Sequence, residues 1–203
     1  MKDRADLTRY HADITAGSLK ISESRIIADL LLRNLDEGQW KAAIYEDNVL
    51  QARTAKTASR LTLLLRGRLE SMESGLWRLV RDGSFVIATH ACLSVAIKHS
   101  ALLGDFMDSV LREQYRLLSS KLSPALWQRY IDDCHSRDPE MPIWAESTVD
   151  RLRSTVFQIL AQGGYIDSTR GMNLQTVHIA RDVLDYLKTH QERYVLRCIE
   201  VRP

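Results

Sequence analysis

The chain has 203 residues, of which 45% are apolar and 27% are charged, with a formal net charge of +2. These values are ordinary for a globular protein with a real core, and no apolar run approaches the roughly 20 residues that span a bilayer. Met1–Asp6 mixes both signs of charge without an apolar segment behind it, so we expect no signal peptide. Because the net charge alone does not indicate a polyanion partner, the distribution of charge must carry that argument.

The three cysteines are Cys92, Cys134 and Cys198. They are far apart and odd in number, which favours free thiols in a reducing compartment over a disulfide framework. We therefore expect a cytoplasmic protein.

Residues 1–82 predict a helix-turn-helix region. Its expected elements are a short helix over Tyr10–Ile14, a helix capped by Ser22, a shorter helix around Trp40–Ile44, and a third helix from Thr54 to Leu69. The turn residues Asn34 and Gly38 separate the second and third of these elements.

The third helix opens with polar residues and has the character of a DNA-reading helix. Its apolar positions share an inner face, whereas Lys56 and Arg60 lie opposite them with Arg53 beside them. We take as candidate nucleic-acid contacts in this region Arg53, Thr54, Lys56, Thr57 and Arg60. The alternative is a solvated basic face with pairs such as Arg66–Glu70, because a run of charge alone is weak evidence.

Residues 83–122 predict a central helical region. Ser84 caps a helix that continues to Ile97, and a second helix runs over Leu102–Leu118. The inner faces are apolar and carry no recognisable chemistry, so this region should fix the geometry of the two ends.

Residues 123–203 predict a winged helix. Ser123-Pro124 starts one helix, a proline-bearing connector follows over Ser136–Pro142, and a helix capped by Ser147 or Thr148 runs to Gln162. Gly163-Gly164 ends that helix. The expected remainder is a hairpin of Tyr165-Ile166 with Leu174–Ile179, a last helix over Ile179–Leu187, and a closing strand over Val195–Val201.

Helix, tight turn and hairpin are the layout of a reading helix and its wing. Four polar residues share the outer face of the helix, and two more lie at the hairpin tip; these candidate contacts are Ser147, Arg151, Ser154, Gln158, Arg170 and Asn173. Gln158 and Asn173 have the amide groups that read adenine edges. The alternative is an ordinary helix followed by a hairpin in any mixed domain. The expected fold is thus mainly α, a helical bundle with an N-terminal helix-turn-helix and a C-terminal winged helix that carries a small β-hairpin.

Short motifs are scattered over about the first half of the chain: Ala16-Gly17-Ser18-Leu19, Glu23-Ser24-Arg25-Ile26-Ile27-Ala28, Asp47-Asn48, Thr54 with Thr57, Arg68-Leu69 and Gly104-Asp105-Phe106. With these motifs the chain resembles the BrxA family, which comprises small helical proteins encoded in BREX bacteriophage-resistance systems. The resemblance implies a cytoplasmic, non-enzymatic component of a defence system that uses host DNA methylation to distinguish self from phage. It also implies a mostly helical fold with DNA-binding helix-turn-helix elements, and makes other BREX proteins candidate partners.

Catalytic and metal chemistry fit the residues poorly. There is no phosphate loop, dinucleotide fingerprint or nucleophile elbow, so we expect no enzyme and no cofactor. His90, Cys92 and His99 lack the spacing of a structural zinc site. The acidic pairs Asp105/Asp108 and Asp132-Asp133 would suit a magnesium-dependent nuclease, but adjacent residues on a helix point apart.

Double-stranded DNA is the partner that we expect, with modest sequence specificity because phosphate contacts carry no sequence information. A protein-docking module, with an exposed Leu63-Leu64 edge or the middle bundle as its interface, is the main alternative. RNA binding is the third, although no aromatic-rich strand is evident that could stack bases. The sequence leaves open whether the protein is a monomer or a dimer.

Overall fold

The computed structural model of the chain describes residues 8–15 and 17–201. Met1–Asp6, on which the expectation about a signal peptide rested, and Ala16 of the first family-like motif lie outside the described residues. The described chain is mainly helical, which confirms the mainly α part of the predicted fold class. Its helices are α1 (Ile21–Leu32), α2 (Glu37–Lys41), η2 (Ala42–Glu46), α3 (Ala55–Glu70), α4 (Ser74–Asp82), α5 (Phe85–His99), α6 (Ala101–Asp105), η3 (Phe106–Leu111), α7 (Arg112–Arg116), α8 (Ala125–Arg137), α9 (Glu146–Gln162), α10 (Arg181–Thr189) and α11 (Arg193–Ile199), where η marks π-helical turns.

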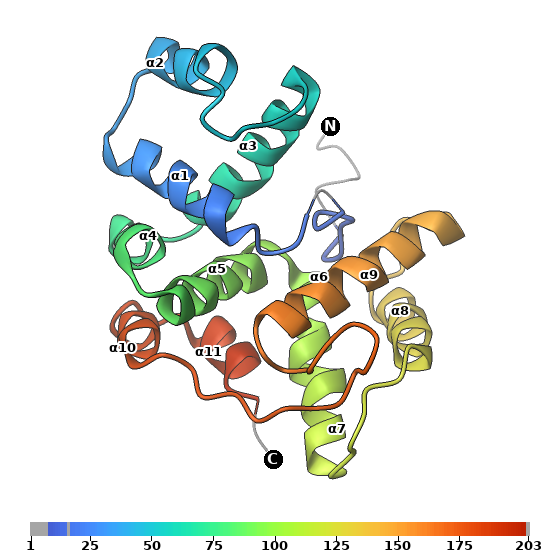
Figure 1. Ribbon diagram of the computed structural model, residues 1–203. Helices are drawn as coiled ribbons and strands as arrows, with labels where there is room; N and C mark the ends of the chain where they lie inside the picture. Colours follow the sequence, from blue (N-terminus) through green and yellow to red (C-terminus); the bar gives the residue numbers. More distant parts are fainter. Residues whose placement is uncertain (1–7, 16, 202–203) are drawn as a thin grey trace.

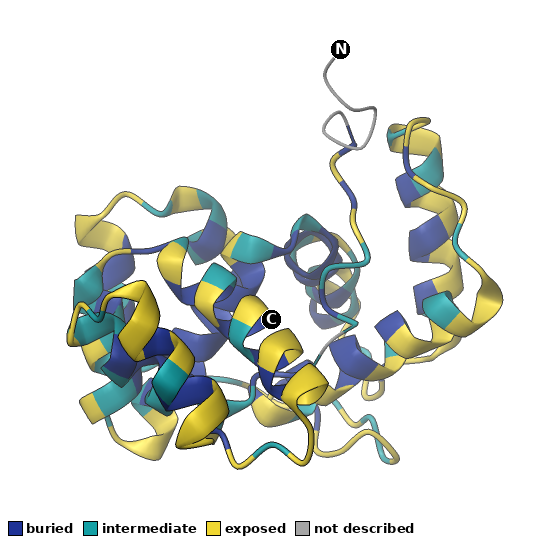
Figure 2. Ribbon diagram, turned by 90° about the horizontal axis from the view of Figure 1, so that it is seen from above, coloured by how far each residue is buried: buried dark blue, intermediate teal, exposed yellow. Residues whose placement is uncertain are grey.

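Helix α5 lies at the centre of the molecule. Every residue from Ala88 to Ile97 is buried, and α5 packs against α1, α3, α4, α6, α10 and α11. Figure 1 shows α1, α2 and α3 above α5, with α10 and α11 below it and α8 and α9 on the right. Figure 2 shows the buried residues gathered on the inner sides of these helices. A helix that is apolar all round is typical of such a position.

The run α6–η3–α7 extends from Ala101 to Arg116 and matches the helix that the sequence predicts over Leu102–Leu118. Phe106 joins this run to two neighbouring helices, because its ring centroid lies 5.4 Å from that of Trp127 and 5.2 Å from that of Tyr130 on α8, and 6.2 Å from that of Phe157 on α9. Such tilted and edge-on ring pairs stabilise a core beyond the area they bury.

Two of the predicted elements near the chain ends are wrong. The residues expected to form a closing strand, Val195–Val201, lie mostly in α11, because Val195, Cys198 and Ile199 bury one helical face rather than alternating. Tyr10–Ile14 forms no helix; its polar groups bond to distant residues instead of to its own turns. Ser22 lies inside α1, and the N-cap position of this helix is occupied by Lys20, which has a φ of +52°. The predicted cap by Ser22 is therefore also wrong.

The predicted β-hairpin does not form regular strands in the described part of the chain. Two isolated antiparallel bridges stand in its place, Ile166 with Leu174 and Lys121 with Asn173. The hydrogen bonds from Leu122 N to Met172 O, at 2.8 Å, and from Asp167 N to Asn173 O, at 3.0 Å, extend this pairing. Each segment pairs for one or two residues only, too few for a strand.

No single described helix combines the length and apolar composition of a membrane span. The bent pair of Phe85–His99 and Ala101–Arg116, whose axes meet at 106°, passes that test of length and composition as a pair.

Candidate nucleic-acid interface

The N-terminal end of α3 carries five of the predicted contacts. Thr54 is the N-cap, as its sequence position indicates: its Oγ1 accepts a hydrogen bond from Thr57 N at 3.1 Å. The two threonine hydroxyl oxygens lie 3.0 Å apart. Both hydroxyls therefore have local partners, and this cap fixes the first turn of α3.

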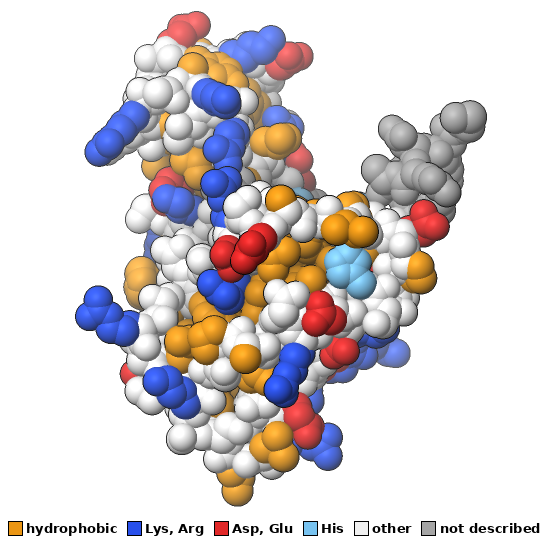
Figure 3. Space-filling model, turned by 90° about the vertical axis from the view of Figure 1, so that its right-hand side faces the viewer, with side chains coloured by type: hydrophobic (Ala, Val, Ile, Leu, Met, Phe, Trp, Pro, Cys, Tyr) orange, Lys and Arg blue, Asp and Glu red, His pale blue; other side chains and the backbone are white. Residues whose placement is uncertain are grey.

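The cations of this end of α3 have no acidic partner in the described part of the chain. Arg53, Lys56 and Arg60 are all exposed, and none forms an ion pair with a described carboxylate. Arg66, in contrast, bonds to Glu70 at 2.7 Å and stacks 4.6 Å above the ring of Trp40. Figure 3 shows several Lys and Arg side chains on the upper part of the molecule, where α2 and α3 lie, as well as others further down the same face. The predicted pair Arg66–Glu70 is therefore confirmed, whereas Arg53, Lys56 and Arg60 form no such pair with a described residue.

Helix α9 buries the face that its sequence predicts. Leu152, Val156 and Ile159 are fully buried, while the candidate contacts are all exposed; these are Ser147, Arg151, Ser154 and Gln158. The helix begins at Glu146 after Ala145 and has no side-chain cap, so the predicted cap by Ser147 or Thr148 is wrong. Gly163 and Gly164, the latter with a φ of +83°, end the helix as expected.

A loop over residues 167–173, hereafter the wing loop, follows α9. The carboxylate of Asp167 organises it by accepting hydrogen bonds from Ser168 N at 2.6 Å, Asn173 N at 2.9 Å and Asn173 Nδ2 at 2.7 Å. These bonds hold the pKa of Asp167 below its ordinary value. Arg170 is exposed without an ion pair to a described residue, so the loop presents this cation while the Asn173 amide is engaged internally.

The wing loop and α9 enclose a groove of about 480 Å³. Arg153, Ser154 and Gln158 line it from α9, and Thr169 and Met172 line it from the wing loop. Two of the predicted contacts, Ser154 and Gln158, thus face the wing loop. Neither adjoins the predicted contacts on α3, so the structure presents two separate candidate surfaces.

One short segment, residues 17–19, joins the C-terminal ends of α3 and α9. Arg68 in the last turn of α3 donates to Ser18 O at 2.6 Å and to Gly17 O at 3.1 Å. The backbone N of Leu19 donates to Oε1 of Gln162, the last residue of α9, at 3.0 Å. Burial lowers the pKa of Arg68 to about 10. Through these hydrogen bonds, the 17–19 junction links the C-terminal end of α3 to that of α9.

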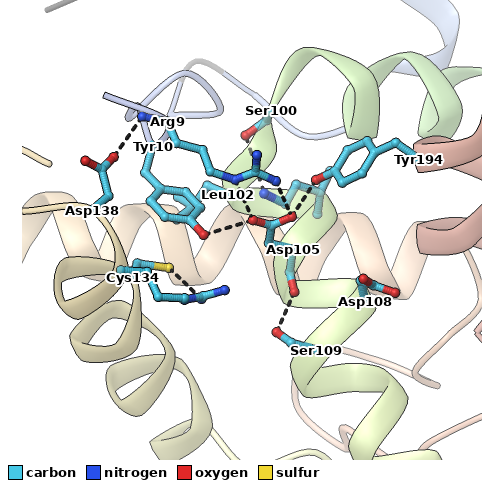
Figure 4. A network of polar contacts seen from close by, with 12 residues as sticks. Arg9, Tyr10, Ser100, Leu102, Asp105, Asp108, Ser109, Cys134, Asp138 and Tyr194 are labelled. Atoms are coloured by element: carbon cyan, nitrogen blue, oxygen red, sulfur yellow. Dashed lines mark hydrogen bonds and ion pairs between the residues drawn. The ribbon is translucent and has the colours of Figure 1, made fainter. Parts of the chain in front are cut away.

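A second polar centre, which sequence reasoning missed, surrounds Asp105 at the end of α6 (Figure 4). Its carboxylate accepts two hydrogen bonds from Arg9, both 2.9 Å long, and one each from the hydroxyls of Tyr10 and Tyr194, both 2.8 Å long. Burial alone would raise the pKa of Asp105, but these hydrogen bonds outweigh it and lower the pKa. The hydrogen bond with Asp105 in turn raises the pKa of Arg9.

The Asp105 centre joins three parts of the chain. Arg9 and Tyr10 come from the N-terminal segment, and Tyr194 comes from α11. Gly104 makes room for them, since a Cβ at this position would lie 2.3 Å from the Tyr194 hydroxyl. The sequence signal was therefore present in the motif Gly104-Asp105-Phe106, although its partners are about 90 residues away in the sequence.

The other titratable groups weighed for chemistry are dispersed. Within residues 8–15 and 17–201, no three His, Cys, Asp or Glu side chains gather where they could hold a metal ion. Burial raises the pKa of the Cys92 thiol to about 11 and that of Cys198 to about 12. His90 accepts a hydrogen bond from Ala180 N at 3.0 Å, and burial lowers its pKa.

Comparison with known proteins shows sequence similarity over nearly the whole chain. The sequence model of the BrxA family matches residues 8–191. The BREX protein BrxA of Paramagnetospirillum magneticum (strain ATCC 700264 / AMB-1) is 48% identical over 193 residues, which cover 95% of this chain and 97% of that protein. The BREX protein BrxA of Escherichia coli O9:H4 (strain HS) is 28% identical over 188 residues, which cover 93% of this chain and 88% of that protein.

A solved structure shares the fold. The crystal structure of an uncharacterized protein from Magnetospirillum magneticum superposes with a TM-score of 0.89 at 47% sequence identity, and the match covers 95% of this chain and 99% of that one.

Proposed function

This chain belongs to the BrxA family of BREX proteins, and on that premise we propose that it is a non-enzymatic accessory protein of a phage-defence system that binds duplex DNA. The observation that carries the proposal is the state of its candidate cations. Five of these cations are exposed and form no ion pair with a described carboxylate; they are Arg53, Lys56, Arg60, Arg151 and Arg170. They lie on two surfaces that also carry short polar side chains. Unpaired cations around small polar groups suit phosphate contacts.

The order of elements supports reading α9 as a recognition helix. The order begins with the run α6–η3–α7, followed by the bridge residue Lys121 and then by helices α8 and α9. After α9 come two further bridge residues, Ile166 and Leu174, one on either side of the wing loop. Residues 120–122 pair with 172–174, which also pair with 165–167. Helices with three short pairing segments in this order form a reduced winged helix, whose third helix enters the major groove in our proposal.

The order α1, α2–η2 and α3 supports a second such element. Helix α3 packs against α1 and η2, and its first turn stays exposed. A three-helix unit of this kind presents the N-terminal residues of its last helix to base edges. We assign to it no strong sequence preference, because most of its polar contacts suit the phosphate backbone.

A salt series tests the proposal directly. Purified protein is titrated into a labelled duplex of about 30 base pairs, and binding is followed by fluorescence anisotropy between about 50 and 200 mM salt. We expect the logarithm of the affinity to fall linearly with the logarithm of the salt concentration. A hairpin RNA of equal charge serves as comparison, and absence of duplex binding at the lowest salt would contradict the proposal.

A docking role within the same defence system is the second candidate, and one observation favours it. Phe85 and Val86, at the start of α5, are 68% and 55% exposed although both are large and apolar. The predicted Leu63-Leu64 edge is only half correct, because Leu64 is buried. Affinity purification from cells that carry the complete defence operon, with Phe85→Ser as comparison, tests this role; recovery of the same proteins with both variants argues against it.

A further inference from the structure

Leu63 is an exposed leucine in the middle of a basic helix face. Its side chain is 79% exposed, although a leucine normally gains stability from burial. It follows Lys56 and Arg60 at the helical spacing i, i+4 and i+7, so the three side chains lie in one row on α3. Leu61 and Leu65 take the opposite face and are buried in the core. The exposure of Leu63 is thus not a consequence of a generally apolar helix.

Leu63 lines a groove on the surface of the protein. A groove of about 450 Å³ runs along Arg60, Leu63 and Gly67, and Asp13 and Thr15 of the N-terminal segment form its other wall. Asp13 is turned into the protein, where its carboxylate accepts a hydrogen bond from the Ser100 hydroxyl at 2.6 Å.

Leu63 is followed along this face by a position without a side chain. At the next position of the row, Gly67 has no side chain, and a Cβ there would lie 3.5 Å from Cε1 of His99. A molecule lying along Lys56, Arg60 and Leu63 would therefore meet no side chain at position 67. The row then reaches Glu70, which pairs with Arg66.

Charge complementarity selects the occupant of this face. Arg60 lines the groove beside Leu63, and Lys56 and Arg53 lie further toward the N-terminal end of the same basic face. None of the three is paired with a described carboxylate. A polyanion fits such a surface, and within duplex DNA the major groove offers an apolar group at the C5-methyl of thymine. We propose that Leu63 contacts a thymine methyl group in the major groove and gives α3 a preference for thymine at that position. This inference rests on the proposed DNA-binding function.

Replacing thymine by uracil isolates this contact, since the two bases differ only in the methyl group. The tightest-binding duplex is selected from a random pool, and uracil is then substituted for thymine at one position at a time. Losing the burial of one methyl group should weaken binding by about fourfold. We expect this loss at one or two positions with the wild-type protein, and equal affinities for thymine and uracil there with Leu63→Ala.

The matched control is Leu117→Ala, because Leu117 is also exposed, at 64%, but lies at the end of α7. The Leu117→Ala variant should discriminate between thymine and uracil as the wild type does. Leu63→Ala should keep the wild-type salt dependence, because an apolar contact releases no counterions. If the wild type discriminates at no position, or Leu63→Ala discriminates equally, the inference is overturned and Leu63 is left to a protein partner. Failure to bind any duplex would instead refute the proposed function.

Discussion

Reversing two charges on α3 should reduce both the affinity for DNA and its salt dependence. The variant Lys56→Glu/Arg60→Glu changes two exposed side chains that have no ion-pair partner among the described residues, so it should fold normally. Lys56 lies in the first turn of α3, where a negative charge interacts favourably with the helix dipole. A loss of binding would therefore report on the interface rather than on stability.

The magnitude follows from the number of unpaired cations. If each of the five candidate cations neutralises one phosphate, the affinity has a logarithmic salt slope of about −4.5 and falls about 500-fold between 50 and 200 mM salt. Removing two contacts leaves a slope of about −2.7 and a fall of about 40-fold over the same range. Fluorescence anisotropy with a duplex of about 30 base pairs resolves this difference.

The control carries the same change of net charge elsewhere. Lys188→Glu/Arg193→Glu also replaces one lysine and one arginine, both exposed, on α10 and α11. Its slope should stay near the wild-type value, because those helices lie on the opposite side of α5 from α3 (Figure 1). Equal slopes for the two double variants would show that α3 is not a specific contact surface and would refute this reasoning.

Three further predictions concern the framework. Gly104→Ala should cost about 1–3 kcal/mol of unfolding free energy by displacing the Tyr194 hydroxyl, and Tyr194→Phe should recover part of that loss in urea unfolding. Since the pKa of Asp105 is lowered in the folded state, its contribution is present above about pH 4 and is lost as the pH falls toward the lowered pKa. Asp105→Asn should therefore flatten the acid limb of the thermal-stability profile; an unchanged limb would contradict this. Thr54→Ala should cost about 1 kcal/mol by removing the cap of α3, whereas Thr54→Ser should cost much less.

The sequence predicted the elements whose stability is local. The face of α9 that contains Leu152 and Val156 follows from apolar spacing alone, because a helix buries whichever stripe is apolar. The start of α3 at Thr54-Ala55 and the Gly163-Gly164 stop of α9 are also local, since each involves backbone groups within a few residues. Both candidate helices could be located for this reason.

The errors fall where distant contacts decide the conformation. Residues 195–201 contain apolar residues at both helical and alternating spacing, and only packing against α5 and η3 decides between the two. The segment around Tyr10 is held by Asp105 and Asp138, neither of which a local pattern reveals. The assignment of individual DNA contacts remains a prediction, because the sequence shows which cations are free of near neighbours along the chain but not what they bind.

The family-like motifs coincide with the framework of the molecule more than with its candidate interface. Arg68 and the Gly17-Ser18-Leu19 stretch form the junction between α3 and α9, and Asp105 anchors the N-terminal segment. The unpaired cations of the proposed interface fall in none of these motifs. A relative can therefore share this framework closely, as the TM-score of 0.89 at 47% identity illustrates, while side chains such as Lys56 and Leu63 are free to differ without cost to the core. The shared fold consequently fixes how the two candidate surfaces are held, and if the proposed DNA-binding function holds, the exposed row of α3 is where differences in DNA preference between relatives should be sought.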